Sequence, residues 1–453
     1  MVARARSARA ATVPVAGIVT VAAAATAAKR MTEGSGVTAA SSERGVQRTL
    51  LSNGLTVLSE YMPGVRSVSL GAWVRSASLH EAREQMGVSH LLEHMVFKGS
   101  ESRTAKELAL ALESLGGSLD AYTGREHTSF QARVLDEHLP QAADVLFDLM
   151  FRPALRQADL DLERGVVLEE ISMVEDTPDD IVFEIHNAAL WGDHPFGYSI
   201  LGTPETVEGL ELADLRSLHD RAYRAGTVVV AASGNVRHDQ LLAVLAQAGW
   251  DALPAGTGAT PRVPAARPAA PSDQAVDRDT QQMHLVFGNA IVPHSDPRRH
   301  ALMLVNSLFG GGMSSRLFQR VREELGLAYS VHSFQSFHVT AGAQGIYVGC
   351  APERAEEAAA AVRAEMLRLT AEGIPADELQ MGKQQLKGQI TLSMESVSAR
   401  MYRAAAVELY NEPYRPLDEV LARVDSVTAG EVAAACRDFY SVDAQTVVRL
   451  GPV

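Results

Sequence analysis

The sequence predicts an α+β protein made of two homologous domains, each a mainly antiparallel β-sheet covered by α-helices. The chain has 453 residues, enough for two to four domains of about 100–200 residues. Residues 251–275 are rich in Pro, Ala and Gly, and this composition predicts a linker between two halves. Strand-like and helix-like segments recur in the same order in both halves, which favours helices packed on a sheet in each.

The first elements of the two halves correspond one to one. Each half begins with a strand and two amphipathic helices, and the first of these helices ends at a phenylalanine, Phe97 or Phe309. The expected strand and helices are 67–74, 87–97 and 102–115 in the first half, and 283–292, 299–309 and 314–325 in the second. We therefore expect an N-terminal extension at 1–45, one domain at 46–250 and a homologous domain at 276–453.

Composition excludes several classes of protein. The chain carries 55 acidic against 41 basic side chains, a formal net charge of −14, whereas a nucleic-acid binder would carry a basic face. Its two cysteines, Cys350 and Cys436, provide no disulfide framework and no cysteine-built zinc module. Beyond residue 30, no apolar run is long enough to span a membrane. Any metal must therefore be held by histidines and carboxylates.

The N-terminal segment differs from the rest of the chain. Three arginines at positions 4, 6 and 9 precede an Ala/Val/Thr-rich stretch at 11–28, which is the outline of a signal or transit peptide. A disordered extension, with Met31 as the true start, is an equally plain interpretation. We expect a cytoplasmic protein, with export or import into an organelle as the alternative.

A zinc-binding motif lies in the first helix of the first half. His90 and His94 are four residues apart, so that on a helix both rings project from one face. Glu93 stands beside them in the order H-x-x-E-H, the inverzincin signature, and can reach a water held by the metal. The alternative is a pair of surface histidines. The corresponding helix of the second half has no such ligands, only Leu302, Val305 and Asn306.

A third ligand is expected from an acidic helix at residues 158–176. Glu163 and Glu170 are seven residues apart and share one helix face, whereas Glu169 points about 100° away. Catalytic zinc sites use three protein ligands and leave a fourth position open. Periodicity alone does not choose between Glu169 and Glu170, and a solvated acidic face is the alternative interpretation.

Three segments, HLLEHMVFKGS, ERGVVLEEI and SSRLFQRVREELGLAYSV, resemble the pitrilysin/insulinase family of zinc peptidases. The smaller members, like the catalytic β-subunit of mitochondrial processing peptidase and its bacterial relatives, are the most similar. The resemblance covers about residues 46–450. It implies one Zn²⁺ per chain, Glu170 as its third ligand and Glu163 as a supporting acidic residue. The implied reaction is peptide-bond hydrolysis, with Glu93 as general base.

The resemblance also implies roles outside the zinc ligands. Arg322 and Tyr329 have the family's R-x₆-Y spacing, so that Arg322 would hold the substrate backbone and Tyr329 would stabilise the oxyanion. Substrate would bind near Phe97 and along the strand edge at Asp120 and Ala121. Asp120 departs from the family, which usually has Asn there, and an ionised Asp accepts hydrogen bonds but donates none.

Quaternary structure and partners follow from the same resemblance. Large single-chain relatives have four such domains and this chain has two, which implies a homodimer whose closed chamber admits unfolded peptides. A heterodimer with a homologous subunit is an alternative. The main alternative function is a non-catalytic core subunit of the same fold, although such subunits usually have degraded zinc motifs. No nucleic-acid partner and no membrane span are expected.

Overall fold

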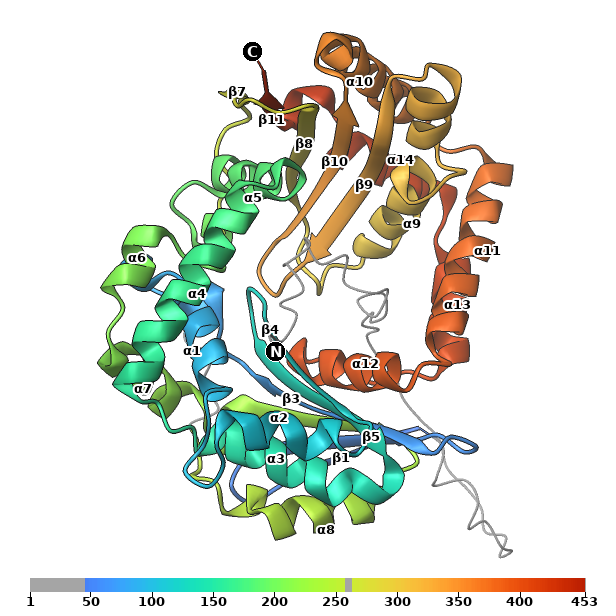
Figure 1. Cartoon of the computed structure of the whole chain (residues 1–453). Coiled ribbons are helices and arrows are strands. Elements are labelled where there is room, and N and C mark those ends of the chain that lie inside the picture. Colours follow the sequence, from blue (N-terminus) through green and yellow to red (C-terminus); the bar gives the residue numbers. More distant parts are fainter. Residues whose placement is uncertain (1–44, 257–262, 453) are drawn as a thin grey trace, which may run out of the picture.

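The computed structural model describes residues 45–256 and 263–452. The predicted N-terminal extension, apart from Gly45, and residues 257–262 of the predicted linker lie outside the described residues. Two sheets, one from each half of the chain, face each other across the molecule (Figure 1). This arrangement confirms the predicted α+β fold with two related domains, while the predicted domain boundaries stay a prediction.

The first sheet has six strands in the order β1-β2-β6-β3-β5-β4. Only β2 and β6 pair in parallel, so the sheet is mainly antiparallel as predicted. Strand β4 lies at one edge and carries the predicted substrate residues. The strands are β1 (Val46–Leu50), β2 (Thr56–Tyr61), β3 (Ser67–Val74), β4 (Ser118–Thr123), β5 (Thr128–Leu135) and β6 (Val228–Gly234).

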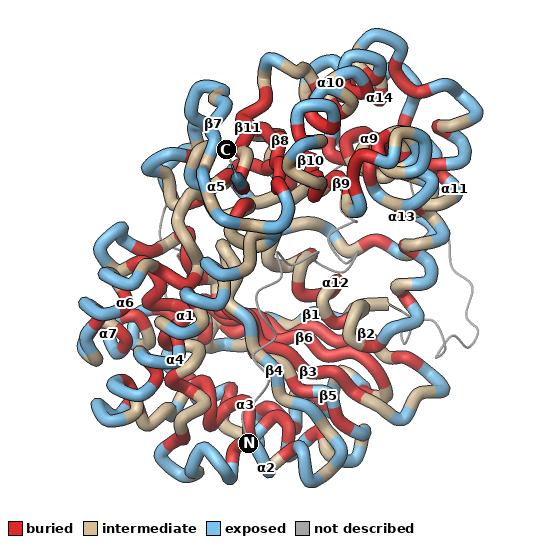
Figure 2. Tube along the Cα trace, turned by 45° about the horizontal axis from the view of Figure 1, so that its top comes forward, coloured by how far each residue is buried: buried red, intermediate tan, exposed pale blue. Residues whose placement is uncertain are grey.

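Helices from the same half cover one face of this sheet and enclose its core (Figure 2). Buried leucines of α1 share this core with valines of β3 and β6. Apolar residues alternate in the sequence of β3 and are spaced by three and four in α1, whereas β6 is apolar through most of its length and buried throughout. The helices are α1 (Val88–Val96), α2 (Ala105–Glu113), α3 (Leu139–Phe151), α4 (Gln157–Glu175), α6 (Pro204–Gly209), α7 (Leu212–Ala222) and α8 (His238–Ala248).

The second sheet has five strands in the order β7-β11-β8-β10-β9, and again only one pair, β7 and β11, is parallel. Its strands are β7 (Asp273–Asp277), β8 (Met283–Ile291), β9 (Ala328–Phe337), β10 (Gly342–Cys350) and β11 (Thr446–Gly451). The accompanying helices are α9 (Arg299–Gly310), α10 (Ala355–Glu372), α11 (Ala376–Ser393), α13 (Leu417–Ser426) and α14 (Ala429–Phe439).

The segment predicted as a helix at 314–325 differs from that expectation. Its central part, Phe318–Glu324, is a π-helix, and the Leu327 N–H bonds to the Val321 carbonyl at 2.9 Å. Gly326 follows with φ +57°, which lets the chain turn directly into β9. A π-helical turn contains one residue more than an α-helical turn, so the segment accommodates one extra residue before Gly326.

Each half contributes one helix to the other half's sheet. Helix α5 (Pro178–Trp191) packs its Val182 against Val286 and Val448 of the second sheet. Helix α12 (Val397–Leu409) packs Met401 and two alanines on the first sheet. Figure 1 shows α12 beside β3 and α5 beside β8 and β11. These apolar contacts hold the two halves of the chain together.

Within the described part of the chain, no helix combines the length and apolar character needed to cross a membrane.

Candidate metal centre

The start of α1 is fixed by a buried carboxylate. Glu81 accepts hydrogen bonds from the backbone N–H groups of Gly87 and Ser89, each at 2.8 Å. Burial raises the pKa of Glu81, and the hydrogen bonds from Ser89 and Gly87 act in the opposite direction by favouring its ionised form. Gly87 has φ +92°, and a Cβ at this position would lie 2.6 Å from the Leu201 carbonyl oxygen. These contacts fix where α1 begins and so place His90 in its first turn.

Three predicted ligands converge between α1 and α4. Ligand atoms of His90, His94 and Glu170 all lie within 4.8 Å of one another. Glu170 Oε2 is 3.7 Å from His90 Nε2 and 3.6 Å from His94 Nε2, too long for hydrogen bonds. Ligands of a tetrahedral zinc, bound at about 2.0–2.2 Å, lie about 3.3 Å from one another. The residues present therefore fit a zinc ion.

The two candidate carboxylates of α4 have different surroundings. Glu170 is partly buried and faces the histidines, whereas Glu169 is exposed. The periodicity of the sequence did not choose between Glu169 and Glu170 as the third ligand. This geometry favours Glu170.

Glu163 lies two turns before Glu170 and contacts the ring nitrogen of His94 that does not face Glu170. It is buried, and its Oε2 is 3.1 Å from His94 Nδ1, so that the other ring nitrogen, Nε2, faces Glu170. Lys98, in the turn that follows α1, forms an ion pair with the same carboxylate. Burial raises the pKa of Glu163, but the bonds to His94 and Lys98 outweigh it and lower that pKa. A carboxylate behind a ligating histidine fixes its tautomer and ring orientation.

The two histidines differ electrostatically in the metal-free protein. Burial, with the nearby His94 charge, lowers the pKa of His90 to about 4. Burial also lowers the pKa of His94, but Glu163, Glu170 and Glu93 together raise it to about 9. His94 is thus protonated at neutral pH, and a metal must displace that proton to bind.

Glu93 is held between α1 and β4. The hydroxyl of Thr123, the last residue of β4, donates a hydrogen bond of 2.6 Å to Glu93 Oε2. Burial raises the pKa of Glu93 to about 7, although the Thr123 hydrogen bond acts in the opposite direction. A carboxyl whose pKa lies near the working pH can both accept and return a proton.

The predicted substrate residues occupy different environments. Phe97 caps the end of α1 and, like Ala121 of β4, packs partly against the first core. Asp120 is exposed on the opposite face of β4, where it pairs with Gln131 of β5. Burial raises the pKa of Tyr402 on α12, and the charge of Asp120 raises it further. Asp120 therefore faces the side of the sheet on which α12 lies.

Arg322 and Tyr329 are not brought to the zinc ligands of the same chain. Arg322 lies in the π-helix and Tyr329 near the start of β9, and Figure 1 shows β9 apart from α1. The Arg322 guanidinium lies 4.7 Å from the centroid of the Tyr329 ring. The Tyr329 side chain is 76% exposed and is open to a partner.

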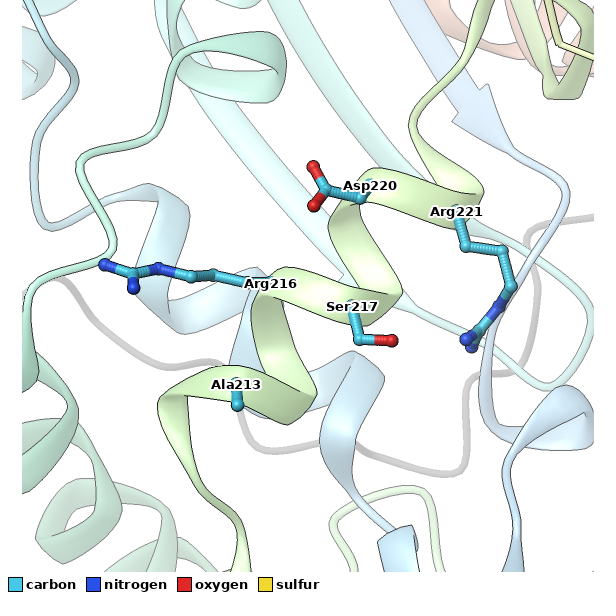
Figure 3. A pocket seen from close by; sticks show the side chains of 5 residues that line it. All are labelled: Ala213, Arg216, Ser217, Asp220 and Arg221. Carbon is cyan, nitrogen blue, oxygen red and sulfur yellow. The ribbon is translucent and has the colours of Figure 1, made fainter.

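A surface pocket of about 650 Å³ lies elsewhere, along α7. Figure 3 shows the five side chains that line it, Ala213, Arg216, Ser217, Asp220 and Arg221. None of them is a predicted site residue, and the Arg216 guanidinium is already bonded to the Leu155 carbonyl at 3.1 Å. This pocket is separate from the candidate metal centre.

Sequence reasoning missed three supporting residues: Glu81, Lys98 and Thr123. Lys98 could have been considered, because it stands only four residues after His94, in the turn that follows α1. Glu81 and Thr123 carry no such signal, since each meets α1 from a separate segment.

The fold and the three convergent side chains are those of a family of zinc peptidases. The sequence matches the family described as Insulinase (Peptidase family M16) at residues 56–204, and the Peptidase M16 inactive domain at 209–386. The chain belongs to this family of peptidases.

Two bacterial relatives are similar over most of their length. A protein of Streptomyces coelicolor named an uncharacterized zinc protease is 37% identical over 87% of each chain. A Bacillus subtilis protein with the same description, YmxG, is 35% identical over 88% of this chain and 96% of its own.

Solved structures show the same fold at lower sequence identity. A protease from Helicobacter pylori is 19% identical with a TM-score of 0.85, over 90% of this chain and 100% of its own. The peptidase M16 inactive domain from Pseudomonas fluorescens is 22% identical with a TM-score of 0.84, over 90% and 98% respectively.

Proposed function

We propose that the protein is a zinc metalloendopeptidase that hydrolyses unfolded peptides or short protein segments. The observation that carries this proposal is the convergence of His90, His94 and Glu170 beside Glu93. Two neutral imidazoles and one carboxylate hold zinc with a net positive charge and leave a fourth position open. Zinc bound there would lower the pKa of a water ligand to about 7 and polarise a carbonyl.

Glu93 acts as the general base in this proposal. The Thr123 hydroxyl holds its Oε2 at 2.6 Å, and a backbone hydrogen bond from Thr123 also acts on this carboxylate. Held in this way, Glu93 would take the proton of the attacking water and deliver it to the departing amine. Glu163 holds the His94 ring at Nδ1 throughout.

The substrate would add as a strand to β4. This strand pairs only with β5 within the described chain, so its outer edge is open to an extended peptide. Strand addition binds the peptide backbone and therefore admits unfolded segments of varied sequence. Asp120 at this edge accepts hydrogen bonds from peptide N–H groups.

Two copies of the chain would complete the site. Arg322 and Tyr329 belong to the π-helix and to β9, a strand that Figure 1 shows apart from α1, and Tyr329 is exposed. A homodimer would place them over the zinc of the partner, where Arg322 holds the substrate backbone and Tyr329 donates to the oxyanion. The two chains would then enclose a chamber too small for folded proteins.

Zinc content and cleavage of a quenched peptide library test the proposal together. Wild-type protein should hold about one zinc per chain and cleave the library, and chelation should abolish cleavage. Glu93→Gln should keep its zinc and lose at least about 10²-fold in rate, because only the base is removed. Near-normal cleavage by Glu93→Gln would contradict its role. A zinc-loaded wild type that cleaves no peptide would favour a non-catalytic core subunit.

A further inference from the structure

One contact links the expected base to the edge strand. Thr123 donates to Glu93 Oε2 at 2.6 Å, from a position at the very end of β4. Side chains alternate along β4: Asp120 and Tyr122 lie on the exposed face, whereas Leu119 and Ala121 pack toward the first core. Thr123 continues the second set and so faces α1.

The same strand would also bind the substrate. A peptide paired with the open edge of β4 has its backbone position fixed, residue by residue, by the backbone of β4. Thr123 is the last residue of this strand, so its position is fixed together with that of the paired peptide. Any displacement of β4 relative to α1 therefore moves both the peptide and the residue that holds Glu93.

Without an anchor, nearby charges can turn the Glu93 carboxylate away from this position: His94 attracts it and Glu170 repels it. The charges of His94 and Glu170 both act on it, and the side chain has three rotatable bonds. A misplacement of about 1 Å in a reacting group can cost about 10²-fold in rate. An anchor on one carboxylate oxygen keeps the other directed at the attacking water.

We propose that Thr123 is a positioning residue that fixes the Glu93 carboxylate relative to the peptide paired on β4. The edge strand then holds the substrate through its backbone and the base through its last side chain. This inference rests on the proposed peptidase function and adds a residue to it.

The test replaces the hydroxyl and keeps the shape of the side chain. Thr123→Val should lower kcat about 10–100-fold, as loss of an outer hydrogen-bond partner does, with KM and zinc content unchanged. Thr123→Ser restores the hydroxyl and should recover most of kcat. Thr123→Ala provides a second variant without the hydroxyl if the valine disturbs folding.

Thr128 offers a matched control. It pairs directly with Thr123 across the hairpin, but its hydroxyl donates to the Ser76 carbonyl at 3.3 Å. The Thr128 hydroxyl also lies 3.5 Å from the Thr123 hydroxyl, but each hydroxyl has a single proton and donates it elsewhere, to the Ser76 carbonyl and to Glu93. Thr128→Val therefore loses a comparable hydrogen bond and leaves the one to Glu93 in place, so it should lose stability and keep the wild-type kcat. Equal losses of kcat in Thr123→Val and Thr128→Val would overturn the proposal.

A second readout needs neither zinc nor activity. In metal-free protein, Thr123→Val and Glu93→Ala each remove the same hydrogen bond. The shift in urea midpoint of the double variant should therefore be smaller than the sum of the two single shifts. Additive shifts, or a Thr123→Val variant with wild-type kcat, would overturn the role of Thr123. A wild-type protein without zinc-dependent cleavage would instead overturn the proposed function itself.

Discussion

Glu169 and Glu170 are adjacent in the sequence, yet their surroundings differ. The second faces His90 and His94 with its Oε2, while the first is exposed to solvent. A single step along a helix rotates the side chain by about 100°. The chemistry of the two carboxylates is identical, so their position relative to α1 decides which one can bind a metal.

Substitutions at these two adjacent residues should have different effects on zinc binding. Glu170→Gln should weaken zinc binding strongly, since it removes a charged ligand, whereas Glu169→Gln should leave the zinc affinity nearly unchanged. Competition with a zinc chelator at pH 7.5 measures both affinities. Strong loss in Glu169→Gln together with full affinity in Glu170→Gln would show that the other carboxylate is the ligand.

Helix α5 shows how an element can belong to one half and stabilise the other. His186 on this helix is only 2% exposed and donates from Nε2 to the Thr446 carbonyl of β11 at 3.2 Å. A Cβ on Gly288 of β8 would lie 2.5 Å from the His186 ring, so only glycine leaves room for it. Burial lowers the pKa of His186 to about 4.

The burial of His186 predicts that its contribution to the stability of the folded protein depends on pH. The folded-state pKa of about 4 lies below the unfolded value of about 6.5, so the unfolded chain binds more protons between these values. The stability contributed by His186 is therefore complete above about pH 6.5 and is lost as the pH falls toward 4.

His186→Gln isolates this contribution from those of the other histidines. The urea midpoint of wild-type protein should exceed that of the variant at pH 7.5, and the difference should shrink as the pH falls toward 4. Midpoints at four or five pH values measure it. A difference that stays constant with pH would show that His186 does not titrate as its burial requires.

The whole molecule separates the proposed catalytic residues into two groups. The metal ligands and Glu93 lie in the first half, whereas Arg322 and Tyr329 lie in the second, in the π-helix and in β9, a strand that Figure 1 shows apart from α1. The exchanged helices α5 and α12 join the halves through apolar contacts on both sheets. A rearrangement within one chain would have to break these contacts, which favours completion of the site by a second copy.

Mixing two inactive variants tests this assembly. In a mixed dimer of Glu93→Gln and Tyr329→Phe, one site carries both defects and the other carries neither. At equal mixing about half of the dimers are mixed, so about a quarter of wild-type activity should return. Differently tagged chains establish that exchange has occurred. Mixed dimers without recovered activity would show that each site is built within one chain.

The sequence by itself determined the fold class and the histidine pair. Alternating apolar residues and helical periodicity predicted the strand at 67–74 and the helices around 87–97 and 158–176, and the structure has them at nearly these bounds. These features depend on local geometry, because 3.6 residues per turn place His90 and His94 on one face in any helix.

Only the tertiary structure decided which distant groups meet. Thr123 reaches Glu93 because β4 lies against α1, and Glu170 faces the histidines because of the rotation of α4. The exchange of α5 and α12 has no local signal, since their apolar faces would fit either sheet. Such contacts depend on how packed elements are placed and rotated, and the periodicity of a single segment does not contain that information.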